Sequence, residues 1–177
     1  LYPTLRMTNL FPASALVDIA SSIDADRAQS LDFRIKQEDM LLDRAWQRFS
    51  FGWGRFGRNR VFDAESGKDI SVTDGRWIIT LGVFGFVGFV AEFGLLAVPV
   101  FRAAAALKFA ASARDQIFLA ALALIVAISI VDLLPNASLS PWTWLLAGAL
   151  LGRSEALCRA ATSKQRTPPT PGLGASW

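Results

Sequence analysis

Long uncharged apolar runs constrain the fold of this chain more than any other feature. No charged residue occurs in 77–91 or in 93–101, which a single acid separates, and none occurs between Gln116 and Val131. A helix needs about twenty apolar residues to cross roughly 30 Å of hydrocarbon. The sequence therefore predicts an all-α, polytopic membrane protein with spans at about 86–101 and 116–134.

A third apolar run, 139–152, begins with Ser140 and Pro141, which are typical of the start of a helix. It needs residues beyond Arg153 to cross a bilayer, so both a span at about 140–157 and a re-entrant helix remain open. We therefore expect two or three transmembrane helices.

The basic residues that follow Trp77 predict the orientation of these spans. They form two groups on the same side of the spans: Arg102, Lys108 and Arg114, then Arg153, Arg159, Lys164 and Arg166. The loop 135–141 on the other side carries no charge. By the positive-inside rule, both basic groups are cytoplasmic and residues 1–76 lie outside. The core helices of a soluble protein would scatter charge along their lengths instead.

The expected organisation has three parts: an outer region over 1–76, a membrane region over 77–160, and a tail over 161–177. The tail is rich in Pro, Gly, Ser and Thr, which predicts a disordered cytoplasmic segment. The chain begins with Leu1 rather than Met, so we expect it to be a piece of a longer polypeptide.

Composition excludes a large part of enzymology. The chain has no histidine, so mechanisms that need imidazole, from Ser-His hydrolysis to His-ligated zinc, do not apply. Cys158 is the one cysteine and forms neither an internal disulfide nor a Cys-based metal site. We expect no metal and no cofactor.

An arginine-rich stretch stands out in the outer region. Its sequence RAWQRFSFGWGRFGRNR, residues 44–60, holds five arginines, five aromatic residues and no acid, with glycines at 52, 54 and 57. Guanidinium groups fork onto phosphate oxygens and glycine lets a backbone approach a ligand, so the stretch predicts binding of a phosphate or pyrophosphate. An amphipathic stretch at the membrane interface is an open alternative. The predicted spans argue against a third reading, a nucleic-acid-binding segment.

Glycines at 82, 85 and 88 shape the first span. They either smooth one helix face or break the helix near Gly85, and we favour the break. A short helix over 74–84 would then lie on the outer surface and 86–101 would cross. Glu92 would lie inside the membrane, where an ionised acid costs roughly 2.5 to 3.5 kcal/mol, so it should face protein or water. A protonated or paired structural role is favoured over a catalytic one.

Two further helices are expected in the outer region. A 3.6-residue apolar period predicts a helix over 30–49 with Ser30 as its N-cap, and a shorter helix over 13–22 follows Pro12. Arg34 and Glu38 either pair on the longer helix or present polar groups to a neighbouring site, but a solvated helix face is the favoured explanation.

The residues between the arginine-rich stretch and the first span predict a loop. Ser66 and Gly67 indicate a turn, and Thr73 or Asp74 would cap the helix that carries Arg76.

The order of these motifs resembles the C-terminal part of the O-antigen ligase/polymerase-like family of bacterial membrane glycosyltransferases. The resemblance covers roughly residues 30–152 and rests on FGWG at 51–54, in the basic outer loop, and on GFVG at 85–88. Family ligases place a His-Asn pair at the start of the amphipathic helix, where this chain has Asp74-Gly75. The resemblance therefore implies a polymerase-type or uncharacterised member rather than a ligase.

The resemblance implies a glycan on undecaprenyl diphosphate as donor, used at the periplasmic face of the inner membrane with the C-terminus cytoplasmic. Arginines would stabilise the departing diphosphate without a metal or nucleotide. We expect Arg58 to be catalytic and the other substrate-binding residues to be Arg55, Arg60, Arg76, Arg34 and Glu38. Asp74 is the expected general base, with Glu38 and Asp63 as rivals, although an N-cap explains Asp74 equally well.

The predicted function is polymerisation or transfer of lipid-linked surface polysaccharide, such as O-antigen or exopolysaccharide. The alternative is a non-catalytic integral membrane subunit of a larger complex. Glu92 and Asp132, in or beside the spans, motivate a third class, a transporter or channel component, but no paired broken helices support it. Expected partners are the undecaprenyl-diphosphate-linked glycan, membrane lipids, and upstream transmembrane helices or other membrane subunits, with no nucleic acid.

Overall fold

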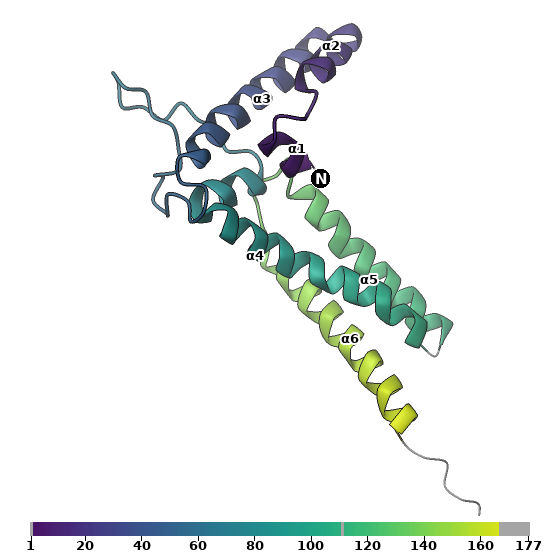
Figure 1. Cartoon of the computed structure of the whole chain (residues 1–177). Helices are drawn as coiled ribbons and strands as arrows, with labels where there is room; N and C mark the ends of the chain where they lie inside the picture. The colour runs from purple at the N-terminus through teal and green to yellow at the C-terminus, as the bar shows by residue number, and fades with distance from the viewer. Residues whose placement is uncertain (1, 111, 167–177) are drawn as a thin grey trace, which may run out of the picture. The chain divides into compact units, whose positions relative to one another are not determined.

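A computed structural model describes residues 2–110 and 112–166, and the regular secondary structure of these residues is helical (Figure 1). The elements in chain order are α1 (Tyr2–Met7), α2 (Ala13–Ile23), α3 (Ala25–Trp46), α4 (Arg76–Ala106), the 3₁₀ turn η1 (Leu107–Phe109), α5 (Ala113–Asp132) and α6 (Pro141–Arg166). The only β pairing in the described part is an isolated bridge between Phe62 and Asp69. The all-α prediction is confirmed.

The chain divides into two compact units. The first comprises Leu1–Leu95 and Ile128–Ser140, and the second comprises Leu96–Ala127 and Pro141–Trp177. The division passes through α4 and α5, so each unit holds part of both helices.

In the first unit, α2 and α3 form a helical hairpin (Figure 1). The helix predicted over 13–22 is confirmed as α2. The longer prediction, 30–49 with Ser30 as N-cap, is wrong at both ends, because α3 runs from Ala25 to Trp46 and its N-cap is Asp24. Its carboxylate accepts the amides of Asp26 and Arg27, at 3.0 and 3.3 Å, which starts the helix in a polar segment that apolar periodicity does not mark.

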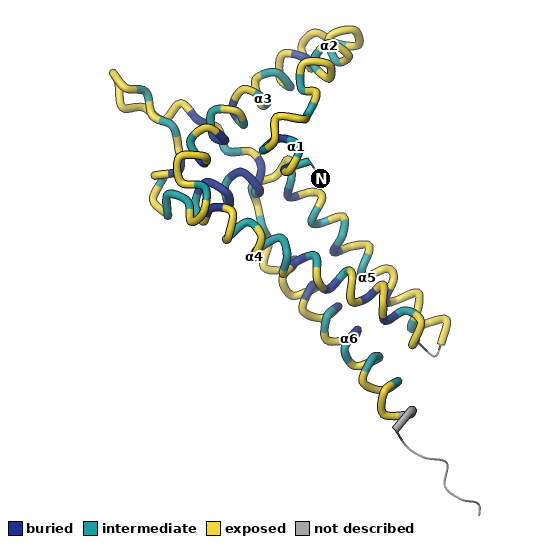
Figure 2. The backbone as a smooth tube through the Cα atoms, viewed as in Figure 1, coloured by how far each residue is buried: buried dark blue, intermediate teal, exposed yellow. Residues whose placement is uncertain are grey.

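The core of the first unit lies between the second half of α3 and the start of α4. Leu41, Leu42 and Ala45 pack against Trp77, Ile78 and Leu81. Both sets recur at three- and four-residue spacing, which places each on one face of its helix. Figure 2 shows these segments as buried. This packing fixes α3 against the first turns of α4, where the predicted site residues lie.

α4 is broken at Gly85, as predicted: its φ and ψ are 68° and −169°, outside the helical region. Residues 49–54 fill the break with four backbone hydrogen bonds. They run from the amides of Trp53 and Gly54 to the carbonyls of Gly82 and Val83, both 2.9 Å, and from the amides of Phe86 and Val87 to the carbonyls of Phe49 and Ser50, 2.7 and 3.2 Å. In an unbroken helix, residues 82–87 would make these bonds among themselves, because each amide bonds the carbonyl four residues earlier.

Gly52 lets the loop approach the break this closely. Its φ is +70°, and a Cβ there would lie 2.6 Å from the amide nitrogen of Gly85 and from the carbonyl oxygen of Val83. The sequence pattern predicted that glycine in this stretch admits a ligand. At Gly52 the close approach is instead to another part of the same chain.

The second unit packs through small and aliphatic side chains. Leu96, Ala103, Leu119, Val126 and Leu150 are buried. Two ion pairs add to this packing: Arg102 donates from Nε to Glu155 at 2.9 Å, and Arg153 donates to Asp115 at 2.6 Å. Large apolar side chains remain exposed on its helices, among them Phe101, Ile117, Phe118, Leu124, Trp142 and Leu145.

Among the described residues, two helices are long and apolar enough to cross a membrane by length and composition: Arg76–Phe109 and Ala113–Asp132. In the apolar 18-residue segment of each helix, only 22% and 11% of the residues are buried, whereas the core helix of a soluble protein would be mostly buried. These helices contain most of the predicted spans at 86–101 and 116–134.

The third predicted span, 140–157, lies in α6, which is not one of these two helices. α6 continues to Arg166, so the tail predicted from residue 161 is helical at its start. That part of the prediction is wrong, because composition alone indicated disorder there. The remainder of the predicted tail, 167–177, lies outside the described residues.

Candidate functional site

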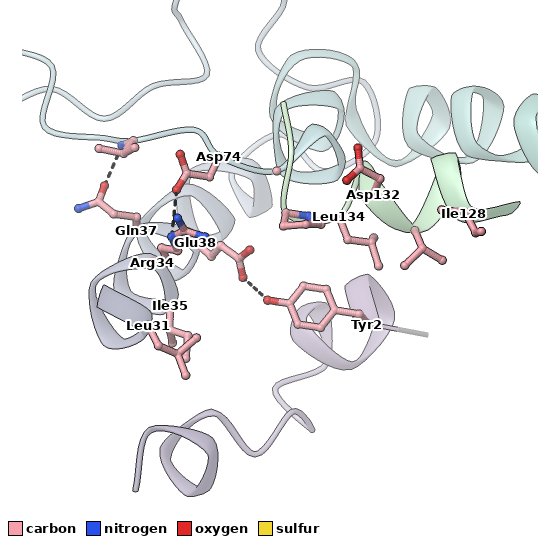
Figure 3. Close-up of a pocket in the computed structure, with 14 residues that line it drawn as sticks. Tyr2, Leu31, Arg34, Ile35, Gln37, Glu38, Asp74, Ile128, Asp132 and Leu134 are labelled. Atoms are coloured by element: carbon pink, nitrogen blue, oxygen red, sulfur yellow. Dashed lines mark hydrogen bonds and ion pairs between the residues drawn. The ribbon is translucent and has the colours of Figure 1, made fainter. Parts of the chain in front are cut away.

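A pocket of about 590 Å³ in the first unit brings three of the predicted site residues together (Figure 3). Arg34 and Glu38 reach it from α3, and Asp74 reaches it from the segment before α4. The rest of its wall is mainly apolar and includes Leu31 and Ile35 of α3 and, from the end of α5 onward, Ile128, Val131, Leu134 and Pro135. The pocket therefore joins a charged edge to an apolar wall.

Glu38 is held by two donors from α1. The Tyr2 hydroxyl donates to its Oε2 at 2.6 Å, and Arg6 Nε donates to the same oxygen at 3.2 Å. Arg6 is only 5% exposed and also donates to Asp39 and to the carbonyl of Ile35. These contacts fix the Glu38 carboxylate in one orientation at the edge of the pocket.

The environment of Tyr2 keeps its hydroxyl protonated. Burial raises the pKa of the phenol well above its usual value, and the hydrogen bond to Glu38 and its negative charge raise it further. Tyr2 therefore acts as a neutral donor toward Glu38.

Arg34 does not pair with Glu38, so that prediction is wrong; its partner is Asp74, with 3.7 Å between Arg34 Nε and Asp74 Oδ2. Arg34 and Glu38 nevertheless both line the pocket, so the fold brings the two side chains to one cavity. Both members of the Arg34–Asp74 pair are about half exposed, at 59% and 45%. The pair is therefore weak and open to rearrangement around a ligand.

Asp74 was also a candidate cap for the helix that begins at Arg76. In the structure the carbonyl of Gly75 accepts the amide of Ile79, which makes Gly75 the first residue of that helical ladder. The Arg76 amide donates to the carbonyls of Leu133 and Asn136, at 3.0 and 2.9 Å. The carbonyls of Leu133 and Asn136 thus accept the Arg76 amide in place of a side-chain cap. The Asp74 residue lines the pocket.

The charges on the pocket favour hydroxyl groups over a diphosphate. Glu38, Asp74 and Asp132 supply three carboxylates, against the one guanidinium of Arg34. Asp132 accepts from the side-chain amide of Asn136 at 2.7 Å. Carboxylates accept hydrogen bonds from hydroxyl groups and repel phosphate oxygens.

The predicted phosphate-binding arginines do not line this pocket. Arg55 and Arg58 are exposed on the loop that continues from residues 49–54, the segment that fills the break in α4. Arg58 Nε donates to the carbonyl of Arg55 at 3.1 Å. In the described part of the chain, neither has a carboxylate within ion-pair distance. Arg60 differs, because it pairs with Asp69 at 2.6 Å.

Two further arginines of the stretch support its fold. The guanidinium groups of Arg44 and Arg48 lie 3.4 and 4.6 Å from the ring centroid of Trp53. The Trp53 indole in turn donates to the carbonyl of Arg44 at 2.7 Å. Cation–π contacts thus fix the loop to the end of α3.

Arg76 is engaged by Glu92 across the break in α4. Its Nε and one terminal nitrogen donate to the two carboxylate oxygens at 2.6 and 2.9 Å, and Thr80 donates to the same carboxylate at 3.2 Å. Sixteen positions along a straight helix span about 24 Å. The pair therefore exists only because the break turns the helix, and it gives Glu92 the paired role that the sequence favoured.

Asp63, the other rival base, shapes a turn. Its carboxylate accepts the amide and hydroxyl of Ser66, at 2.7 and 2.8 Å. These hydrogen bonds lower the pKa of Asp63 below its usual value. The turn predicted at Ser66 and Gly67 is confirmed, since the Gly67 amide bonds the carbonyl of Asp63 at 2.9 Å.

Sequence reasoning missed Tyr2 and Asp132, which line the pocket, and Arg6, which holds Glu38 in place. Tyr2 and Arg6 meet Glu38 across more than thirty residues of chain, and α1 is too short for a periodic signal. Asp132 was noted only as an acid beside a span. Within the described residues, no group of three or more Cys, Asp or Glu side chains is arranged to hold a metal ion.

No protein-family model matches the chain, and the comparisons with curated proteins and with solved structures found no match.

Proposed function

We propose that this protein takes part in polymerisation or transfer of a lipid-linked surface polysaccharide at the outer face of a bacterial inner membrane. One observation carries the proposal: Arg34, Glu38 and Asp74 converge on a pocket whose opposite wall is the end of an apolar helix, α5. A site with a carboxylate edge and an apolar wall suits a reaction between a sugar hydroxyl and a lipid-linked donor.

The membrane placement is supported by the low burial of α4 and α5 and by the distribution of basic residues. In this arrangement the helices Arg76–Phe109 and Ala113–Asp132 cross the bilayer. Residues 1–76 and the loop after α5 are periplasmic.

Asp74 is the proposed general base. It is half exposed and borders the pocket, and its one ion pair among the described residues is 3.7 Å long, so it is accessible to an acceptor hydroxyl. Glu38 is proposed to orient the acceptor, because Tyr2 and Arg6 already hold its carboxylate in place.

Arg55 and Arg58 are the proposed ligands of the donor diphosphate, because they are exposed and have no carboxylate neighbour in the described part of the chain. In the reaction, the acceptor oxygen attacks the anomeric carbon and its proton passes to Asp74. The bond from that carbon to the diphosphate breaks, and its electron pair leaves with the diphosphate, where guanidinium groups stabilise the added charge.

The proposal is tested with the full chain in nanodiscs that contain undecaprenyl-diphosphate-linked glycan. Arg58→Lys keeps the charge but removes the two-pronged hydrogen bonding, so donor binding should weaken several-fold. Arg27→Lys is the matched control, since Arg27 is 85% exposed and lies outside the pocket and the loop. Equal donor binding by the two variants would contradict the role of Arg58.

Asp74→Asn separates binding from chemistry. Donor binding should be retained, and transfer of labelled glycan should fall by about 10²- to 10⁴-fold, the usual contribution of a general base. Unchanged transfer in Asp74→Asn would refute Asp74 as the base.

One observation favours the second candidate, a non-catalytic membrane subunit. Asp74 lines the 590 Å³ pocket, whereas Arg58 lies on the loop at the break in α4 and lines neither that pocket nor a second one formed beside Arg55 and Arg60. A subunit of this kind predicts that Asp74→Asn and Arg58→Lys both leave cellular polymer unchanged. Loss of polymer would then follow only from variants that unfold the protein.

A further inference from the structure

Two phenylalanines are exposed on the loop 48–58, whose first half fills the break in α4. Phe51 and Phe56 are 77% and 95% exposed. Phe56 also has a φ of +66°, a left-handed conformation that is strained for a residue with a Cβ. The fold therefore holds a large apolar ring at the protein surface on a strained backbone.

The loop is fixed rather than free to turn these rings inward. The four backbone hydrogen bonds of residues 49–54 to α4 hold its first half, and the guanidinium groups of Arg44 and Arg48 against Trp53 hold it to α3. Gly54 and Gly57 take positive φ on either side of Phe56. The exposure of the two rings is thus a property of the folded chain.

Every charged residue in the stretch that carries the rings, residues 44–60, is an arginine. Arg48, Arg55 and Arg58 are exposed beside them, and in the described residues none of the three forms an ion pair with a carboxylate. A surface that presents aromatic rings among guanidinium groups without a carboxylate partner is complementary to the headgroup layer of an anionic bilayer.

The loop is also continuous with an apolar part of α4. Phe84, Phe86 and Val87 are 39%, 40% and 53% exposed at the break, and Arg55 lies 5.8 Å from the ring centroid of Phe84. Residue 86 is where the predicted crossing helix begins. The rings and the start of the apolar helix therefore share one region of the first unit.

We propose that residues 48–58 form an interfacial anchor, in which Phe51 and Phe56 enter the outer leaflet and Arg48 contacts the phosphates of anionic phospholipids. This inference rests on the membrane placement in the proposed function but not on its chemistry. With these rings in the outer leaflet, the loop lies at the depth of the lipid headgroups. Arg55 and Arg58 are then at the level of a lipid diphosphate.

The experiment uses site-directed spin labels, because Cys158 is the one native cysteine. In a Cys158→Ser background, single labels are placed by Phe51→Cys and Phe56→Cys in the full chain, reconstituted in phospholipid vesicles with anionic lipid and without polyprenyl diphosphate. Ser66→Cys, in the exposed turn, is the control in water, and Leu124→Cys, on α5, is the reference within the bilayer.

The anchor predicts that labels at 51 and 56 are several-fold less accessible to a water-soluble nickel complex than the label at 66. If 51 and 56 are as accessible as 66 while 124 is shielded, the anchor is overturned and the membrane placement stands. If 124 is as accessible as 66, the membrane placement fails and the anchor fails with it. Failure of the diphosphate-binding experiment alone leaves the anchor intact, so the two proposals are distinguishable.

A second measurement tests the role of charge. The label at 56 should become more accessible to the nickel complex when anionic lipid is replaced by zwitterionic lipid, and Arg48→Gln should reduce that difference. Arg27→Gln, which changes an exposed arginine outside the loop, should preserve it. No effect of lipid charge on the label would overturn the contact of Arg48 with lipid phosphate.

Discussion

The backbone amide of Trp53 donates to the carbonyl oxygen of Gly82 across 2.9 Å. In a continuous helix that carbonyl would accept the amide of Phe86, which here bonds Phe49. A loop segment thus supplies the hydrogen bonds that α4 gives up at Gly85. The break is a defined joint between two parts of the sequence rather than a weak point.

This joint predicts a difference between two glycine substitutions. Gly67 has a φ of +65° and open space around its Cβ position, so Gly67→Ala should cost about 1–2 kcal/mol from backbone strain alone. Gly52→Ala, at a φ of +70°, adds a clash with the α4 backbone and should cost about 1–3 kcal/mol more. Thermal unfolding in detergent measures both, and equal losses would show that the loop does not depend on close approach to the break.

The Arg76–Glu92 pair predicts non-additive stability effects. Its side chains are 26% and 13% exposed, so Arg76→Gln leaves a largely buried carboxylate without its main partner, at about 1.5–3 kcal/mol. The double variant Arg76→Gln/Glu92→Gln should be less destabilised than Arg76→Gln, because no lone charge remains.

Lys36→Gln is the matched control for that pair. Lys36 and Asp32 form an exposed i, i+4 pair on α3, worth about 0.3–0.5 kcal/mol. Chemical denaturation of the four variants gives the comparison. Simple additivity of Arg76→Gln and Glu92→Gln would mean that the two halves of α4 are not coupled through this contact.

Tyr2 is the one tyrosine of the chain, so its ionisation can be followed by phenolate absorbance. Burial, and then Glu38, raise its pKa above the ordinary value of 10.0, so the absorbance should stay flat through that pH in the folded protein. Because the folded pKa is raised, the stability contributed by Tyr2 is present below about pH 10 and is lost as pH rises through the folded value.

Glu38→Gln should move the Tyr2 titration to lower pH by removing the neighbouring negative charge. Asp18→Asn, at an exposed position of α2, is the control and should leave it unchanged. A Tyr2 midpoint at the ordinary value in the native chain would contradict the contact of α1 with Glu38.

Asp69 predicts an acid-sensitive loop. The hydrogen bond from Arg60 lowers the pKa of Asp69, with hydrogen bonds from Ser71 adding to the effect. Because the folded pKa is depressed, the stabilisation is present above about pH 4 and is lost as pH falls through the folded value. The protection factors of the amides of residues 61–70, that is, the exchange rates corrected for their intrinsic pH dependence, should therefore fall at acid pH, and the fall should begin at higher pH in high salt.

Asp69→Asn should lower these protection factors already at neutral pH and remove most of their pH dependence. Asp43→Asn, an exposed acid on α3, tests for a general effect of charge. Identical pH profiles for Asp69→Asn and the native chain would show that the Arg60–Asp69 pair does not hold the loop.

Features that depend on local chemistry were predictable from the sequence. Gly85 interrupts an apolar run, and only glycine takes its φ of 68° without strain, so the break was visible. The helix after Pro12 and the uncharged stretches of α4 and α5 were also visible, because helix starts and hydrophobic length are local properties.

Features that depend on contacts distant in sequence were not predictable. Glycines in an arginine-rich stretch indicate close approach, but the pattern does not say whether a ligand or another segment approaches, and Gly52 meets α4. Arg76 resembled a ligand-binding arginine because Glu92, its partner, lies on the far side of the break. Arg34 and Asp74 were singled out separately, and only the fold brings them to one pocket.

The filled break also limits how the protein can be dissected. A fragment that begins after residue 54, as one designed around the apolar helices alone would, leaves the carbonyls of Gly82 and Val83 and the amides of Phe86 and Val87 without their partners. Those groups would then hydrogen-bond to one another in a straight helix or to water. Truncation experiments therefore need to retain Phe49–Gly54 if the expressed piece is to keep the bend of the native chain.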